Sequence, residues 1–199
     1  MANVAKDITL SCQTEFTADQ LIMHYTVTNR SQNDVYILDV SPTIDLATKE
    51  PITNLDIIYL GWEKPATAHI LKGIMPLPVE RRVMVRLMPL GAKLPPQQEL
   101  VRTFKVNLPL QEQSPYYLPV QKYTEQDFET RSVSNLLLTV QFVRSIAESF
   151  AVTEAPHGPD LYAFKGKYLI DYVENMQCES AIQSQPLLVR KGPFARIEL

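Results

Sequence analysis

Histidine and cysteine, the side chains best suited to metal binding, are few and widely spaced in this sequence. The chain has three histidines and two cysteines, and no two of them show the close spacing of a zinc motif. His157 and Asp160 are the pair near enough in sequence to share a site, but their proline-containing segment is more simply a solvent-exposed turn. His24 falls on the polar face of an expected strand. The sequence therefore predicts neither a metal nor a cofactor.

Signals for nucleophilic or acid–base catalysis are also weak. The chain has no Gly-x-Ser-x-Gly segment, which would expose a serine on a strained turn. Cys12 occupies an inward-facing position of an alternating strand. Glu125, Asp127 and Glu129 cluster in a polar stretch, so they lack the burial that tunes a catalytic carboxylate. The six glycines are isolated from one another, which excludes a glycine-rich phosphate loop. We therefore expect no enzymatic activity.

A proline-stiffened segment from 113 to 123 is the first candidate for binding. It carries two prolines and three tyrosines, Tyr116, Tyr117 and Tyr123. Proline reduces the entropy that a loop loses on binding, and tyrosine is favoured at protein interfaces. The alternative, which we favour for the rings themselves, is that they cover the end of the hydrophobic core with their hydroxyls at the surface.

An aromatic series near the C-terminus is the second candidate. Tyr162, Phe164, Tyr168 and Tyr172 would share one face of an unbroken strand. If Gly166 turns the chain, the same rings would pair across a hairpin. One interpretation is a stacking platform for sugars or bases. The other is a packed face of the core, and we favour the second.

The elements that must position these residues are strands, because apolar residues alternate with period two far more often than with the helical period. Fifteen prolines and six glycines interrupt the apolar runs, and proline suits turns and edge strands.

A capping box predicts one short helix at 124–127, and the segment 145–155 is ambiguous between helix and strand. The segments 91–98 and 108–119 are expected to be loops within one domain. The expected strands cover residues 8–12, 21–28, 35–40, 83–87, 100–108, 136–144, 162–164, 168–172, 187–190 and 194–197.

The segment from Leu21 to Leu38 resembles the second and third strands of immunoglobulin-like modules, in which a strand ending in Val-x-Asn precedes a polar turn and another apolar strand. The segment from Arg86 to Gly91, followed by a strand that leads to Pro109, is similar to another part of such domains. The chain departs from antibody domains because its single tryptophan, Trp62, has no suitably placed cysteine partners. The resemblance implies a scaffold used mostly for binding.

Together these features predict an all-β fold: one immunoglobulin-like antiparallel β-sandwich over residues 1–199. We expect about seven to nine strands, long loops and at most one or two short helices. Cys12 and Cys178 are most simply two small buried hydrophobic residues, although a sandwich could bring them close enough to bridge.

Net charge and hydropathy restrict the kinds of partner that we expect this chain to bind. The formal net charge is −3, with 9 basic and 11 acidic side chains in residues 1–100 and 10 and 11 in residues 101–199. This even distribution argues against nucleic-acid binding. No apolar stretch reaches the length of a membrane span, and the N-terminus has no apolar core of a secretory signal. We expect a cytoplasmic protein, although a chain trimmed of an export signal would look the same.

The function that we expect is a non-enzymatic protein-binding or assembly module. It would recognise a protein partner, or a second copy of itself, through the loop at 115–119 or an exposed sheet edge. The alternative is a hydrolase-like or carbohydrate-binding protein. That protein would use a cleft near Tyr162–Tyr172 that holds His157 and Asp160.

Overall fold

Strands make up most of the protein, in a computed structural model that describes residues 7–77, 86–116, 124–144, 151–165 and 169–191. Within those residues there are thirteen strands rather than seven to nine, and two short 3-10 helices. The elements are β1 (Ile8–Phe16), β2 (Gln20–Asn29), β3 (Val35–Ile44), β4 (Pro51–Asn54), β5 (Tyr59–Lys64), β6 (Thr67–Lys72), β7 (Leu90–Leu94), β8 (Glu99–Asn107), β9 (Leu110–Gln111), η2 (Glu125–Asp127), β10 (Phe128–Arg144), β11 (Ala151–Glu154), β12 (Leu161–Lys165), η3 (Leu169–Tyr172) and β13 (Glu174–Arg190).

The first sheet contains β1, β2 and β8 in that order, and all its pairs are antiparallel. Alternation along β2 explains its place in the middle: one face of the strand is buried and the other carries polar side chains. On β8, Phe104 and Val106 point inward in the same way. The buried face of β2 consists of Leu21, Met23, Tyr25 and Val27.

The second sheet has ten strands, and β10 lies at its centre. β10 pairs with β13 along most of its length, and its other edge pairs with β6 and then with β3. The β6–β10 and β9–β13 ladders are parallel, so the sheet is mixed rather than purely antiparallel as expected. The reason is that β6 and β9 reach their partners through long connections, which parallel pairing requires.

One hydrophobic core fills the space between the sheets. Inward residues of β2 and β8 pack against those of β6 and β10 in a single cluster. The expected all-β sandwich is confirmed, and its two short helices are η2 and η3. Among the described residues, no helix is long and apolar enough to cross a membrane.

The turn between β2 and β3 shows how the sequence sets the local structure. Asn29 is fully buried, and its Nδ2 donates to the carbonyls of Asn33 and Leu94, both at 2.9 Å. Its Oδ1 accepts from the backbone N and the hydroxyl of Ser31. The buried amide therefore closes the turn and ties it to β7, and the polar run after β2 forms the expected connection.

Several expected elements need correction. The expected strand at 168–172 is wrong: Leu169–Tyr172 form η3, closed by a bond from Val173 N to Ile170 O at 3.3 Å. The expected loop at 91–98 contains most of β7, and residues 187–190 are only the end of the long β13. The expected helix at 124–127 is confirmed as η2, where Thr124 N donates to Asp127 Oδ2 at 2.6 Å. Residues 83–85, 145–150 and 194–197 lie outside the described part of the chain.

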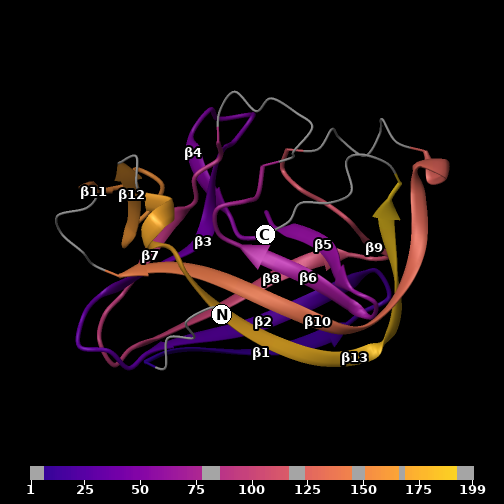
Figure 1. The fold of residues 1–199 in the computed structure, drawn as a ribbon. Coiled ribbons are helices and arrows are strands. Elements are labelled where there is room, and N and C mark those ends of the chain that lie inside the picture. The colour runs from indigo at the N-terminus through magenta and orange to yellow at the C-terminus, as the bar shows by residue number, and fades with distance from the viewer. Residues whose placement is uncertain (1–6, 78–85, 117–123, 145–150, 166–168, 192–199) are drawn as a thin grey trace.

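The two sheets also meet along one edge, where β1 runs beside β13 (Figure 1). Cys12 on β1 and Cys178 on β13 are both half-buried and free. Burial and then interaction with the Cys178 thiol raise the pKa of Cys12 to about 12. The sequence did not determine whether Cys12 and Cys178 are close in space. In the folded protein the two thiols interact.

Candidate functional site

Tyr116 helps to hold the structure together. The ring is half-buried and packs against a small cluster that contains Tyr59, Leu71 and Met75. Its hydroxyl accepts a hydrogen bond from Leu87 N at 2.9 Å. The contacts agree with the covering role expected for this ring. The other tyrosines of the loop, Tyr117 and Tyr123, lie outside the described residues.

Tyr162 and Phe164 pack against the body of the protein rather than forming a free platform. Both rings meet Tyr36 edge to face, with centroids 5.3 Å and 5.6 Å away. They belong to a second hydrophobic cluster with Leu38 and Val143. Tyr168 lies outside the described residues, and Tyr172 belongs to η3 rather than to the strand that carries the other two rings.

His157 and Asp160 lie in the turn between β11 and β12. Asp160 has a positive φ of 56°, and its carbonyl accepts from Lys93 N at 3.0 Å. His157 Nδ1 is buried without a hydrogen-bond partner in the described part of the chain. No group of three metal-binding side chains occurs among the described residues. The geometry of this turn adds no support for a hydrolytic site.

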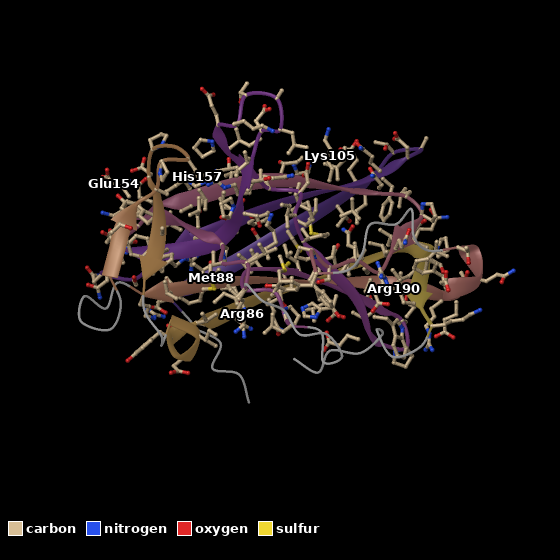
Figure 2. The ribbon with its side chains drawn as sticks, turned by 90° about the horizontal axis from the view of Figure 1, so that it is seen from above. Arg86, Met88, Lys105, Glu154, His157 and Arg190 are labelled. Carbon is tan, nitrogen blue, oxygen red and sulfur yellow. The ribbon has the colours of Figure 1, made fainter. Side chains whose placement is uncertain are left out.

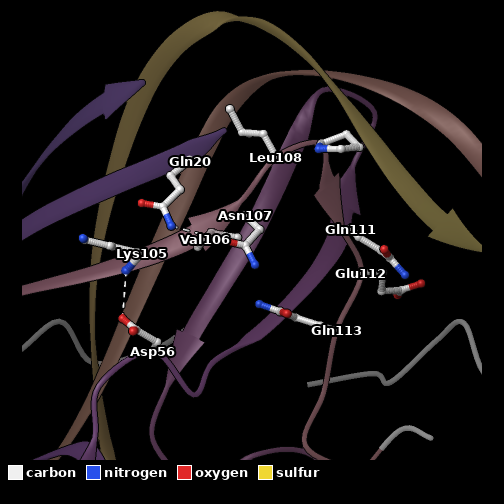
Figure 3. A pocket seen from close by; sticks show the side chains of 10 residues that line it. Gln20, Asp56, Lys105, Val106, Asn107, Leu108, Gln111, Glu112 and Gln113 are labelled. Atoms are coloured by element: carbon white, nitrogen blue, oxygen red, sulfur yellow. Dashed lines mark hydrogen bonds between the residues drawn. The ribbon is translucent and has the colours of Figure 1, made fainter. Parts of the chain in front are cut away.

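A cavity lies at the other end of the molecule, where β8 ends and β9 begins (Figure 3). Its volume is about 390 Å³, within the range of small-molecule sites. Figure 2 places His157 toward one end of the protein and Arg190, whose backbone contacts the cavity wall, toward the other. Four carboxamides and two carboxylates line it: Gln20, Asn107, Gln111, Gln113, Asp56 and Glu112.

Hydrogen bonds to the backbone and between side chains hold polar groups of this cavity in place. Asp56 Oδ1 accepts from Lys105 N at 3.0 Å (Figure 3), and Gln20 Nε2 donates to Asn107 Oδ1 at 3.4 Å. The segment after β9 is fixed because Gln113 and Leu60 exchange two backbone hydrogen bonds of 2.9 Å. The wall is built from three segments that the fold brings together: Gln20, Asp56 and residues 105–113.

Two groups in the wall are unusual. Glu112 is 1% exposed, and its Oε2 accepts from Arg190 N at 2.9 Å. Burial raises the pKa of this carboxyl to about 7, and Arg190 offsets the rise in part. Gln111 Nε2 is buried with no hydrogen-bond partner among the described residues. A buried donor without an acceptor costs roughly 1–3 kcal/mol.

A buried polar network lies between the sheets behind the cavity. Tyr25 donates to Asp39 Oδ2 at 2.6 Å, and Arg102 Nε lies 3.4 Å from the same oxygen. Lys72 is fully buried and donates to the Leu55 carbonyl. Burial lowers the pKa of Lys72 to about 8, while the Asp39 and Asp56 carboxylates raise it in part. The opposite charges compensate one another, and we interpret the network as structural.

Among the described residues, the hairpin formed by β3 and β4 carries the largest group of exposed apolar side chains that are close in sequence. It projects from the sandwich (Figure 1). Ile44 is 59% exposed, Leu46 is 83% exposed and Ile52 is 40% exposed. Ile44 lies opposite Pro51, whereas Ile52 lies opposite Thr43. The two isoleucines therefore occupy opposite faces of the ribbon, and Leu46 lies at its tip.

The tip of this hairpin is tightly ordered. Asp45 Oδ1 accepts from Ala47 N at 2.7 Å and from Thr48 N at 3.1 Å. The same hydrogen bonds lower the pKa of the Asp45 carboxyl. Its backbone bonds with Lys49 and Glu50 close the turn. The Asp45 side chain thus fixes the loop that presents Leu46, as in an Asx turn.

Sequence reasoning missed both the hairpin and the cavity. Ile44 and Ile52 flank the mostly polar turn that contains Leu46, and that spacing was the available signal for a hairpin. Their exposure could not be inferred, because apolar side chains usually point inward. The chain matches no protein-family model, no curated protein and no solved structure.

Proposed function

We propose that this chain is a non-enzymatic protein-binding module that inserts its β3–β4 hairpin into an apolar recess of a partner protein. The observation that carries the proposal is the exposure of Ile44, Leu46 and Ile52 on one projecting ribbon. Large apolar side chains that cluster on a surface mark interaction sites more often than single ones do. Because apolar groups lie on both faces and at the tip, the complementary surface is a groove that encloses the hairpin.

The order of the tip supports this role. A loop already fixed by the Asp45 hydrogen bonds loses little conformational entropy on binding. Polar and charged residues of the turn, Asp45, Lys49 and Glu50, would form the solvated rim around a leucine anchor. The alternative partner for the hairpin is a second copy of the same chain. The experiment below distinguishes this self-association from binding to a different protein.

The test is photo-crosslinking from the hairpin tip in cells that produce the protein. A photoreactive amino acid replaces Leu46 in one variant. In the matched control it replaces Val101, which is 66% exposed on the outer face of β8. We expect position 46 to crosslink to a distinct protein that position 101 does not capture. Leu46→Ser should abolish co-purification of that protein, whereas Val101→Ser should retain it.

Two results would contradict the proposal. One is equal crosslinking from positions 46 and 101. The other is co-purification that Leu46→Ser leaves unchanged. A crosslink to a second copy, accompanied by a dimer in sedimentation that Leu46→Ser dissociates, would identify the assembly form of the same surface.

A further inference from the structure

The cavity between β8 and β9 is independent of the hairpin and has the features of a small-molecule site. It is concave, it has a volume of about 390 Å³ and polar side chains converge on it from separate segments. Gln111 contributes a buried donor without an acceptor among the described residues. Because this nitrogen is buried from solvent, the groups that can reach a ligand are the exposed amide of Asn107 and the half-buried amide of Gln113.

The hydrogen-bonding character of the wall defines the class of ligand. Carboxamides both donate and accept, and carboxylates accept. A hydroxyl group also does both, so a molecule rich in hydroxyls can pair with each type of group in the wall. Val106, Leu108 and Pro109 supply an apolar part of the wall, which suits the C–H face of a sugar ring.

Charge and shape disfavour the other classes. Burial raises the pKa of Glu112 to about 7, so near neutral pH Asp56 and Lys105 largely offset each other and the wall has no net positive charge to attract a phosphate. No aromatic side chain is present in the described wall, so a nucleobase would find no ring to stack on. A polyamine remains as a competitor that the carboxylates could attract.

We propose that this cavity binds an uncharged, hydroxyl-rich ligand of monosaccharide size, with the side-chain amides of Asn107 and Gln113 contacting its hydroxyls. The site is distinct from the aromatic series at β12. It uses amides rather than stacked rings, and it lies at the opposite end of the sandwich (Figure 1).

The experiment is a ligand-observed NMR titration of the full chain with D-glucose, D-galactose, D-mannose and N-acetyl-D-glucosamine. Inorganic phosphate and spermidine serve as charged comparisons. We expect at least one sugar to bind, with a Kd of about 1 mM or tighter. Asn107→Ala, which alters an exposed side chain, and Gln113→Ala should each weaken binding about fivefold, the effect of one lost hydrogen bond. Gln13→Ala, an exposed amide on β1, is the matched control and should have no effect.

Gln113→Ala separates a binding role from a structural one, because only the backbone of Gln113 is bonded to Leu60. If its side-chain amide contacts a ligand, this variant should bind the sugar more weakly while its denaturation midpoint stays the same. A lower midpoint with unchanged sugar binding would overturn the proposal. Failure of all four sugars to bind would also overturn it, as would binding of phosphate or spermidine alone. The hairpin variants of the proposed function should leave the titration unchanged, so the two proposals can fail separately.

Discussion

Glu112 shows how burial of a single carboxyl group makes stability depend on pH. The folded protein holds this group with a pKa of about 7, whereas the ordinary value is 4.5. Between these two pH values the folded chain keeps a proton that the unfolded chain has released. The contribution of this group to stability is therefore complete below pH 4.5 and declines as the pH rises to about 7.

We predict that Glu112→Gln removes this decline. Glutamine keeps a carbonyl oxygen that can accept from Arg190 N, and it carries no charge to desolvate. Above pH 7 the variant should be more stable than the parent by on the order of 2 kcal/mol, whereas at pH 4.5 the two should be similar. Denaturant unfolding at a series of pH values measures the difference, with the exposed Glu15→Gln as control. A stability difference that does not vary with pH would show that the carboxyl charge is not its cause.

At the scale of elements, the β3–β4 hairpin contains one unfavourable backbone conformation. Lys49 has a φ of 62°, in the left-handed region that a side chain with a Cβ atom disfavours. The turn needs this conformation, because Lys49 N donates to the Asp45 carbonyl at 2.8 Å. Strain is thus localised next to the surface that we assign to partner binding.

We predict that Lys49→Gly stabilises the protein by up to about 1 kcal/mol, because glycine adopts this conformation without strain. Lys49→Ala keeps the Cβ atom and removes the same charge, so it should leave stability nearly unchanged. The two variants are compared by their denaturant midpoints. A larger loss of stability for glycine than for alanine would mean that the added freedom of the unfolded chain outweighs the relief of strain.

The elements that sequence reasoning found are those with regular alternation. β2 and β10 alternate apolar and polar residues, so their existence and type were predictable. β6 was missed because it is buried on both faces and yet contains His69 and Lys72, which interrupt the apolar pattern. His69 is tolerated there because its Nε2 bonds with Thr139 Oγ1 at 2.8 Å, a contact between residues far apart in sequence.

The sequence pattern also failed to predict most of β13, because few residues of that part of the strand are apolar. The strand from Glu174 to Gln185 is rich in polar residues, because much of it lies at the surface, and it forms through its ladder with β10. The candidate sites depend on still longer-range order. The amides of the cavity come from separate segments, and the exposure of Leu46 follows from where the hairpin emerges. The spacing of residues along the sequence predicts neither the convergence of these amides nor the exposure of Leu46.

At the scale of the whole molecule, the contact between Cys12 and Cys178 links the two sheets at the edge where β1 lies beside β13. Each thiol belongs to a different sheet, and the residues lie far apart in sequence. A bond between them would close a very long loop, which restricts the unfolded chain strongly. The raised pKa of Cys12 leaves little thiolate at neutral pH, so oxidation should be slow there and faster at higher pH.

We predict that oxidised glutathione, a small disulfide, converts these two thiols into one intramolecular disulfide. The protein loses two electrons and two protons, and the reagent is reduced to two glutathione thiols. Mass spectrometry should show the loss of two hydrogen atoms and a crosslinked peptide that contains both cysteines. The oxidised protein should be more stable by about 2–4 kcal/mol. Cys12→Ser cannot form the bond and should show only a mixed disulfide at Cys178. If the parent protein also gives only mixed disulfides, under conditions that oxidise a model dithiol, then the two thiols do not approach closely enough to bridge, and the edges of β1 and β13 are held together by packing alone.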